Sequence, residues 1–271
     1  MNTLAQPPLT SKHNNNEELV KLELSDDIAT ITLNNPGRHN SLTIDLLKQL
    51  NERLEKLTRN NAVKILILQA EGRSFSTGGD IKAFYAHADT ILDYSQEIVG
   101  LLNQSILHML RLPVPILTKI QGPVTGGSFG FVLASDLVVM DDSAFFAPYY
   151  VDVGFAPDGG WSAILPDRIG HNRAKAIQLL NTRIDSATAL EWGLVTATCN
   201  NSALDSQINT WITTLREKVE QSLVATKQGI NTAALIERYQ RGLEEERQAF
   251  IKLASTPEAK QGMENFLSQF S

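Results

Sequence analysis

The sequence predicts an α/β fold that carries an additional helical region. Short apolar runs typical of strands alternate with helical patterns in residues 19–200, whereas residues 201–271 contain helical patterns only. Hydrophobic residues make up 42% of the 271 residues and charged residues 20%, as in a globular protein with a sizeable core. Residues 1–18 are expected to form a disordered tail. We therefore interpret the chain as a core domain between this tail and a C-terminal helical region.

The first part of the core predicts two strands, a helix and a third strand. Apolar and polar residues alternate in residues 20–24 and 28–33, which predicts a strand pair. Thr43 is expected to cap a helix whose apolar positions are Leu46, Leu47, Leu50, Leu54 and Leu57. The apolar run at residues 63–68 predicts a buried strand, and a long helix is expected at about residues 90–112.

The remaining elements continue this alternation. Further strands are predicted at residues 137–140, 143–146 and 194–198. Helices are expected at about residues 160–167, 173–180 and 186–192. In the C-terminal region, Pro257 is expected to open the last helix, because its fixed φ suits the first helical position.

A glycine-rich stretch, KIQGPVTGGSFG at residues 119–130, lies between two apolar runs. A strand that turns through glycines into a helix presents free backbone N–H groups, which can bind a phosphate, a carboxylate or an oxyanion. A nucleotide triphosphate site is disfavoured, because Ser128 stands where the phosphate-binding motif has its lysine. The dinucleotide-binding pattern G-x-G-x-x-G is absent from this stretch.

The same stretch matches the nucleophile elbow of serine hydrolases. Gly126 to Gly130 has the pattern G-x-S-x-G around Ser128, and Asp158 and His171 follow in the order that such a triad needs. However, the residues GPVT separate the elbow from the preceding strand, and a long helical region follows His171. A serine hydrolase built on Ser128, Asp158 and His171 is one alternative, which fluorophosphonate labelling of Ser128 would test.

A second loop, RSFSTGGDIK at residues 73–82, also follows a buried strand and leads into a helix expected from Asp80. Two strand-to-helix turns, each with a free glycine N–H, can converge on one oxygen atom and form an oxyanion hole. Such a site favours an enolate or a tetrahedral oxyanion over a neutral carbonyl. The alternative is that both loops are ordinary tight turns.

Composition and charge limit the kinds of partner and the cellular compartment that we expect for the protein. The formal net charge is −6 and no cluster of Lys and Arg stands out, so no nucleic-acid partner is expected. No apolar run approaches the ~20 residues that a membrane span needs. The single cysteine, Cys199, suits a reducing cytoplasm, and the histidines lack the paired spacing of a metal site. We expect a cytoplasmic protein without a bound metal.

Four motifs together resemble the enoyl-CoA hydratase/isomerase (crotonase) superfamily: NNPGRHNSL, RSFSTGGDIKAF, IQGPVTGGSFGF and PDGGWSAILPDRIG. The resemblance implies a spiral of β-β-α repeats and C-terminal helices that assemble homotrimers, often paired into hexamers. It implies an acyl-CoA thioester as substrate, no separate cofactor, and a carbonyl held between the N–H groups of Gly79 and Gly127. The substrate-binding positions that it implies here are Arg38, Asn40, Asp80, Ile81, Lys82, Gly126 and Tyr150.

The sequence departs from the hydratases of this superfamily at both catalytic glutamates. Those enzymes use two glutamates to activate water, and the corresponding positions here are Gly130 and Tyr150. Asp158 matches the aspartate that moves protons in several double-bond isomerases of the superfamily. We therefore predict an enoyl-CoA isomerase in which Asp158 is the base.

Other roles for Asp158 stay open at this point. Related dehalogenases carry an aspartate nucleophile in this region, and a hydratase or a non-catalytic acyl-CoA binder is also an alternative. Asp158 could instead only cap a helix that starts near Gly159. Several aromatic residues surround Asp158 in sequence, and burial among them would raise its pKa: Phe145, Phe146, Tyr149, Tyr150, Phe155 and Trp161.

Overall fold

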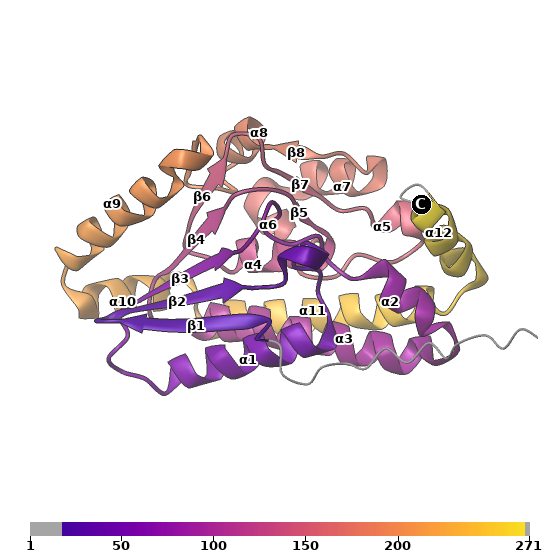
Figure 1. Cartoon of the computed structure of the whole chain (residues 1–271), viewed down its shortest axis with the longest axis horizontal. Helices are drawn as coiled ribbons and strands as arrows, with labels where there is room; N and C mark the ends of the chain where they lie inside the picture. Colours follow the sequence, from indigo (N-terminus) through magenta and orange to yellow (C-terminus); the bar gives the residue numbers. More distant parts are fainter. Residues whose placement is uncertain (1–17, 269–271) are drawn as a thin grey trace, which may run out of the picture.

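Six strands form the main sheet of the protein. The computed structural model describes residues 18–268, so of the predicted tail only Glu18 is included. The strand order is β1 (Val20–Ser25), β2 (Ile28–Leu33), β3 (Ile65–Ala70), β4 (Ile116–Ile120), β6 (Leu137–Asp141) and β9 (Ala197–Cys199). β1 and β2 are antiparallel, and all other neighbouring strands are parallel (Figure 1). The carboxyl ends of the parallel strands therefore share one edge, where ligands bind in open α/β sheets.

Short strands form a second, three-stranded sheet. β5 (Val124–Thr125) pairs in parallel with β7 (Phe145–Ala147), and β7 pairs antiparallel with β8 (Ile184–Asp185). β4 is followed by β5 and β6 by β7, so successive turns of the chain add strands to both sheets before a helix returns the chain. The predicted α/β spiral of strand, strand and helix is confirmed.

Helix α1 (Ile44–Thr58) shows how the sequence determines one element. Thr43 Oγ1 accepts a hydrogen bond from the N–H of Leu46 at 3.2 Å, so the predicted cap is confirmed. The predicted apolar positions all face the core, because their spacing places them on one side of a helix: Leu46, Leu47, Leu50, Leu54 and Leu57. Each such buried leucine stabilises the fold by roughly 1.5–3 kcal/mol.

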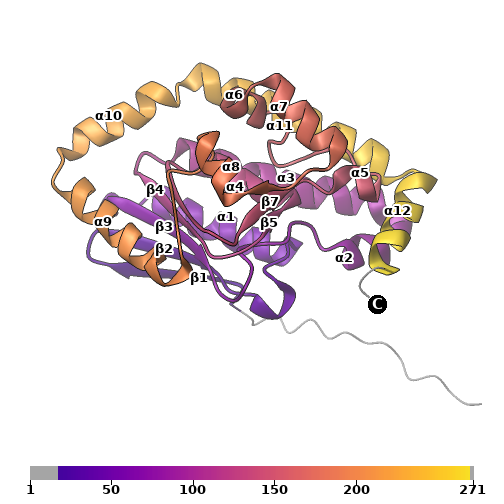
Figure 2. The ribbon, with the colours of Figure 1, turned by 90° about the horizontal axis from the view of Figure 1, so that it is seen from above.

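Helices cover both faces of the main sheet (Figure 2). α1, α3 (Ile91–Arg111) and α11 (Ala233–Ala254) enclose the main hydrophobic core on one side. α9 (Leu204–Arg216) covers the opposite face, where a smaller core consists of Ile65, Leu117, Val139, Leu204, Ile208 and Ile212. Neighbouring strand residues such as Ile65 and Leu66 belong to different cores, as the alternation of side chains along a strand requires.

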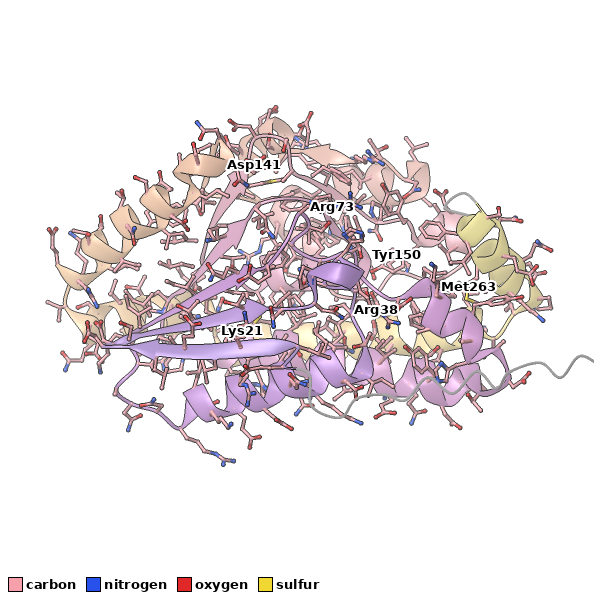
Figure 3. All side chains as sticks on the ribbon, viewed as in Figure 1. Lys21, Arg38, Arg73, Asp141, Tyr150 and Met263 are labelled. Carbon is pink, nitrogen blue, oxygen red and sulfur yellow. The ribbon has the colours of Figure 1, made fainter. Side chains whose placement is uncertain are left out.

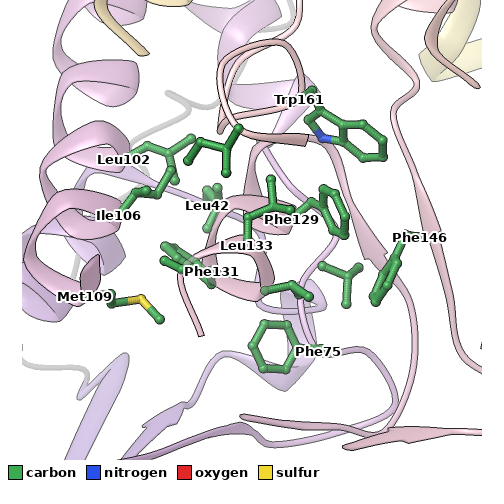
Figure 4. Close-up of a cluster of buried hydrophobic side chains, with 14 of the residues drawn as sticks. Leu42, Phe75, Leu102, Ile106, Met109, Phe129, Phe131, Leu133, Phe146 and Trp161 are labelled. Carbon is green, nitrogen blue, oxygen red and sulfur yellow. The ribbon is translucent and has the colours of Figure 1, made fainter. Parts of the chain in front are cut away.

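Six shorter helices lie between the strands and the long helices in the chain order. They are α2 (Ile81–Ala86), α4 (Phe129–Leu133), α5 (Tyr150–Val153), α6 (Leu165–Ile169), α7 (His171–Leu180) and α8 (Ser186–Glu191). Phe129 of α4 packs between Trp161 and Phe146, with ring centroids 4.5 and 4.8 Å apart (Figure 4). This packing fixes the start of α4 and therefore the glycine turn that precedes it.

The C-terminal region is helical, as predicted, and consists of α9, α10 (Glu220–Ile230), α11 and α12 (Pro257–Ser268). α12 packs against α2 and α5 of the same chain, and Tyr85 donates a hydrogen bond to Glu264 Oε1 at 2.9 Å. Assembly of this region into trimers stays a prediction. Among the described residues, no helix combines the length and the apolar character needed to cross a bilayer.

The predicted helix at residues 160–167 is wrong in its first half. Gly159 and Gly160 have φ of +64° and +88°, which lie in the left-handed region that favours glycine. Turns therefore extend to Ile164, and α6 begins only at Leu165. The predicted strand at residues 194–198 is likewise shorter and is observed as β9, Ala197–Cys199.

Candidate active site

The glycine loop after β3 and the glycine loop after β4 lie side by side. A short parallel bridge joins Ser76 to Val124. The N–H of Ser76 donates to Pro123 O at 3.2 Å, and the N–H of Thr125 donates to Ser76 O at 3.1 Å. The hydroxyl of Ser128 lies 3.1 Å from Ser76 O and 2.8 Å from Thr125 O. These contacts bring the two predicted loops together.

Glycine is required at the point of closest approach between these loops. Gly78 has a φ of +72°, and a Cβ atom built on it would lie 2.4 Å from Thr125 O. Gly126, at a φ of +55°, faces it from the other loop, and a Cβ atom there would lie 3.7 Å from Gly78 Cα. A side chain at Gly78 would therefore push the loops apart.

The N–H groups of Gly79 and Gly127 lie outside the local hydrogen-bond pattern. Leu42 pairs with Gly79 through the carbonyl of Gly78, at 2.7 Å, and the N–H of Asp80, at 3.4 Å. The bridge therefore does not use the N–H of Gly79. Gly127 belongs to the 3-10 turn Gly126–Ser128, and N–H groups of a first helical turn have no acceptor within the helix. Both groups can therefore donate to an oxyanion.

The side chain of Asp158 lies directly against Gly127. A Cβ atom built on Gly127 would be 2.6 Å from Asp158 Oδ1. The hydroxyl of Tyr150 donates a hydrogen bond to the same oxygen at 2.5 Å, and both side chains are buried. Figure 3 shows Tyr150 beyond the carboxyl ends of the parallel strands. Asp158 caps no helix, because no helix begins at Gly159.

The surroundings of Asp158 perturb its ionisation. Burial raises the pKa of Asp158 from 3.8 to about 7. The hydrogen bond from Tyr150 opposes this change because it stabilises the carboxylate, whereas the negative charge of Glu246 adds to it. Burial also raises the pKa of Tyr150 well above 10, so its hydroxyl keeps the proton. A carboxyl group with a pKa near 7 can both accept and release a proton at neutral pH.

Sequence reasoning missed Glu246, which is buried beside the turn that follows Asp158. Its carboxylate accepts a hydrogen bond from the N–H of Gly160 at 2.8 Å. A signal was present in the sequence, because Leu243 and Phe250 lie three residues before and four residues after Glu246. This spacing places Glu246 on the buried face of α11, where an unpaired acidic residue is unusual.

Gly130, the position of a glutamate in the hydratases, has no room for a side chain. A Cβ atom there would lie 2.4 Å from Ile106 Cδ1 and 2.6 Å from the carbonyl oxygen of Gly159. The end of the Ile106 side chain can move aside, but the carbonyl of Gly159 is backbone, so a glutamate would displace the turn after Asp158. The other predicted water-activating position is Tyr150, whose hydroxyl is bound to Asp158.

Four of the predicted substrate-binding residues lie at the start of α2 and beside it. The side chain of Arg38 is 67% exposed, and its guanidinium lies 3.6 Å from Asp80 Oδ2. Asp80 also caps α2, while Ile81 is half-buried and Lys82 is exposed in the first turn of this helix. Arg38 and Lys82 are accessible to an anionic ligand.

The structure gives Asn40 a supporting role, and its predicted contact with substrate stays a prediction. Its side chain is fully buried. Nδ2 donates to Glu71 O at 2.9 Å and to Ser74 O at 3.0 Å, and Oδ1 accepts from the N–H of Asn35 at 2.7 Å. The amide therefore holds the glycine loop after β3 against the preceding turn. Gly126 also has a structural contact, since its carbonyl accepts a hydrogen bond from Trp161 Nε1 at 2.8 Å.

Ser128, Asp158 and His171 do not form a triad. Ser128 is fully buried, and its hydroxyl bonds to backbone carbonyl groups. His171 is exposed at the start of α7, and the carboxylate of Asp158 is bound by Tyr150. The serine hydrolase alternative therefore has no support in this geometry. Within residues 18–268, no group of three or more His, Cys, Asp or Glu side chains could hold a metal ion.

Comparisons with known proteins extend this description. A family model described as enoyl-CoA hydratase/isomerase matches residues 23–270. The chain is 31% identical over 195 residues to 4-chlorobenzoyl coenzyme A dehalogenase-2 from Arthrobacter sp, covering 72% of this chain and 71% of the relative. It is 29% identical over 208 residues to trans-2-decenoyl-[acyl-carrier-protein] isomerase from Streptococcus mutans, covering 76% and 78%. A crystal structure of an enoyl-CoA hydratase from Bacillus halodurans matches with a TM-score of 0.86 at 26% identity, covering 91% and 99%.

Proposed function

Since the chain belongs to the enoyl-CoA hydratase/isomerase family, we propose that it shifts a double bond within an enoyl-CoA thioester. The observation that carries this proposal is a single buried carboxyl group, Asp158, directly beside Gly127. Its pKa of about 7 suits a group that removes a proton and returns it. The relative named as a trans-2-decenoyl-[acyl-carrier-protein] isomerase supports the same reaction class.

The proposed reaction starts from a 3-enoyl thioester whose carbonyl oxygen lies between the N–H groups of Gly79 and Gly127. The carboxylate of Asp158 removes a proton from the carbon next to the carbonyl, and a dienolate forms. The two N–H groups stabilise the negative charge on its oxygen more strongly than the neutral carbonyl. Asp158 then returns the proton to the γ carbon, which gives the 2-enoyl thioester and restores the carboxylate.

Hydration is disfavoured because it needs a second acid–base group close to Asp158. Gly130 cannot carry one without displacing backbone, since a Cβ atom there would lie 2.6 Å from the carbonyl oxygen of Gly159. Glu246 is the other carboxylate that acts on Asp158, but its oxygens already accept hydrogen bonds from backbone N–H groups and Ser162. A 1,3-shift of a proton needs one base only, and this site supplies one.

Displacement of a leaving group by Asp158 is a second candidate, because the relatives include proteins named 4-chlorobenzoyl coenzyme A dehalogenases. The carboxylate would attack the carbon that carries the halogen, form an ester and release halide. Water would then have to cleave the ester, and this step again needs a second base. The lack of a second acid–base group, which disfavours hydration, therefore also makes displacement less favoured than isomerisation.

Incubation of 3-enoyl-CoA and 2-enoyl-CoA with the purified protein tests the proposal. The protein is expected to interconvert them, and Asp158→Asn is expected to lower the rate by about 10²–10⁴-fold, the typical contribution of a general base. Asp45→Asn is the matched control, because Asp45 is exposed in the first turn of α1.

Three other results would contradict the isomerase assignment. Hydration that survives in Asp158→Asn would show that another residue activates water. Halide release from 4-chlorobenzoyl-CoA without isomerisation would favour displacement. Binding of acyl-CoA measured by calorimetry, without turnover of either enoyl thioester, would favour a non-catalytic binding protein.

A further inference from the structure

Glu246 of α11 is a buried carboxylate that the proposed reaction does not use. Its Oε2 accepts from the N–H of Gly160 at 2.8 Å. Its Oε1 accepts from the N–H of Ser162 at 2.6 Å, from the hydroxyl of Ser162 at 2.7 Å and from the N–H of Ala163 at 2.8 Å. Burial raises the pKa of Glu246, whereas these hydrogen bonds oppose that change, because all the partners donate to the carboxylate and stabilise its ionised form.

The turn that Glu246 binds is held on its other side by the second oxyanion loop. Trp161 Nε1 donates to the carbonyl of Gly126 at 2.8 Å. A Cβ atom built on Gly159 would lie 2.4 Å from Gly127 O and 2.7 Å from Gly127 Cα, so the two backbones touch. The turn at residues 158–163 is therefore clamped between α11 and the loop that carries Gly127, and Asp158 is its first residue.

We propose that Glu246 is a positioning residue for Asp158: it anchors this turn to α11 and thereby holds the carboxyl group of Asp158 against Gly127. The inference rests on the proposed function, because it concerns the same base. It also gives the C-terminal helical region, predicted from sequence to serve assembly, a direct role in the active site of its own chain.

The charge of Glu246 has a second consequence at Asp158. The ionisable groups that act on Asp158 are Tyr150 of α5 and Glu246. The charged residues that line the cleft beside Glu246 are Arg238, Arg241 and Glu245. Because the negative charge of Glu246 disfavours a second negative charge nearby, it raises the pKa of Asp158. Removal of this charge should therefore lower the pH at which Asp158 ionises.

Two substitutions separate position from charge. Glu246→Gln keeps the length of the side chain but replaces one acceptor oxygen by a donor and removes the charge. We expect kcat for isomerisation to fall about 10–100-fold with little change in KM, since a small misplacement of a catalytic group has effects of this size. The midpoint of the rise of kcat/KM with pH should move to lower pH. Glu246→Asp keeps the charge but shortens the anchor, so kcat should fall while the midpoint stays.

Glu245→Gln is the matched control, because it removes the same charge from the neighbouring, exposed position of α11. It should leave both kcat and the midpoint unchanged. Wild-type kcat and midpoint in Glu246→Gln would overturn the proposal. Loss of thermal stability in Glu246→Gln, with unchanged kcat at low temperature, would also overturn it, because a purely structural residue behaves in this way.

A measurement without turnover distinguishes failure of this inference from failure of the proposed function. The carboxyl stretching band of Asp158 can be identified in infrared difference spectra between the wild type and Asp158→Asn. Its titration midpoint should be lower in Glu246→Gln than in the wild type, whether or not any enoyl-CoA is converted. An unchanged midpoint would overturn the link between Glu246 and Asp158, whereas a protein without isomerase activity but with a lowered midpoint would overturn only the reaction.

Discussion

Two aspartates at opposite ends of the main sheet hold their carboxyl groups in contrasting surroundings. Asp136 directly precedes β6, at the amino ends of the parallel strands, and its Oδ2 accepts from Lys227 Nζ at 2.6 Å and from the N–H of Ile116 at 2.8 Å. Asp158 lies at the other end, beside the glycine loop that carries Gly127. Its hydrogen-bond donor is the neutral hydroxyl of Tyr150, and the charge that acts on it is the negative charge of Glu246.

The difference shows that the surroundings of an aspartate decide whether a nearby charge compensates its carboxylate. At Asp136 a cation compensates the carboxylate, and the pair joins α10 to the strands. At Asp158 no positive charge within residues 18–268 compensates the carboxylate, so the protonated and ionised forms are close in free energy at neutral pH. Such a buried, uncompensated group is costly for the fold, and a perturbed pKa of this kind is typical of catalytic sites.

The largest expected effect concerns stability at Asp158. Its pKa is about 7 in the folded chain against 3.8 in an unfolded one, so its favourable contribution is complete below pH 3.8 and is lost as pH rises through about 7. At pH 8 this loss amounts to about 4 kcal/mol. Asp158→Asn removes the ionisation. Its free energy of unfolding relative to the wild type should therefore rise by about 3 kcal/mol between pH 5 and pH 8.

Urea denaturation of both proteins at the two pH values measures this difference. Asp136→Asn is the comparison, because Asp136 is compensated by Lys227 in the folded chain. A stability difference for Asp158→Asn that is equal at both pH values would show that Asp158 does not carry the raised pKa, and the contrast between the two aspartates would fail.

Loss of the compensating carboxylate at Asp136 should reduce stability without affecting chemistry. The side chain of Lys227 is only 7% exposed, and Asp136→Asn would leave its charge buried without a counter-ion. Breaking a buried pair in this way costs about 3 kcal/mol, at the low end of the usual range because Asp136 itself is 25% exposed. Isomerisation measured well below the unfolding temperature should be unchanged. The second substitution Lys227→Met should restore most of the stability, and a double variant as unstable as the single one would contradict this account.

Strong periodic patterns in the sequence predicted most of the fold. The leucine spacing of α1, with Thr43 as its cap, is a local signal that tertiary packing reinforces, and both are confirmed. The helix predicted from residue 160 failed in its first half because Gly159 and Gly160 adopt positive φ. Glu246, far along the chain, binds the N–H groups of Gly160 and Ser162 in the turn that forms there instead. A contact of such long range cannot be read from a local window.

The candidate site likewise has some features that could be predicted from the sequence and others that could not. The glycine turns that contain Gly79 and Gly127 could be predicted, because the preceding residues, Gly78 and Gly126, adopt a positive φ that favours glycine. The role of Asn40 could not be predicted, because motif position says nothing about burial, and the fold encloses its side chain completely. Its amide is instead used on the carbonyl groups of Glu71 and Ser74. Gly130 stands where the hydratases have a glutamate, and the structure leaves no space for a side chain there beside the carbonyl oxygen of Gly159.

The smallest expected effect concerns the hydroxyl of Tyr150, the hydrogen-bond donor that distinguishes Asp158 from an acid that is only buried. Tyr150→Phe removes the hydroxyl that stabilises the carboxylate, so the pKa of Asp158 should rise further, and the midpoint of kcat/KM against pH should move to higher pH. A hydrogen bond to a charged group contributes about 1.5 kcal/mol, or about one pKa unit, so from a pKa of about 7 the ionised fraction of Asp158 and the activity at pH 7 should fall roughly sevenfold. Tyr149→Phe is the control, because the hydroxyl of Tyr149 is bound by Arg183 at 2.9 Å instead of by Asp158. A midpoint that falls in Tyr150→Phe, or that moves equally in both variants, would show that the Tyr150 hydroxyl does not set the ionisation of the base.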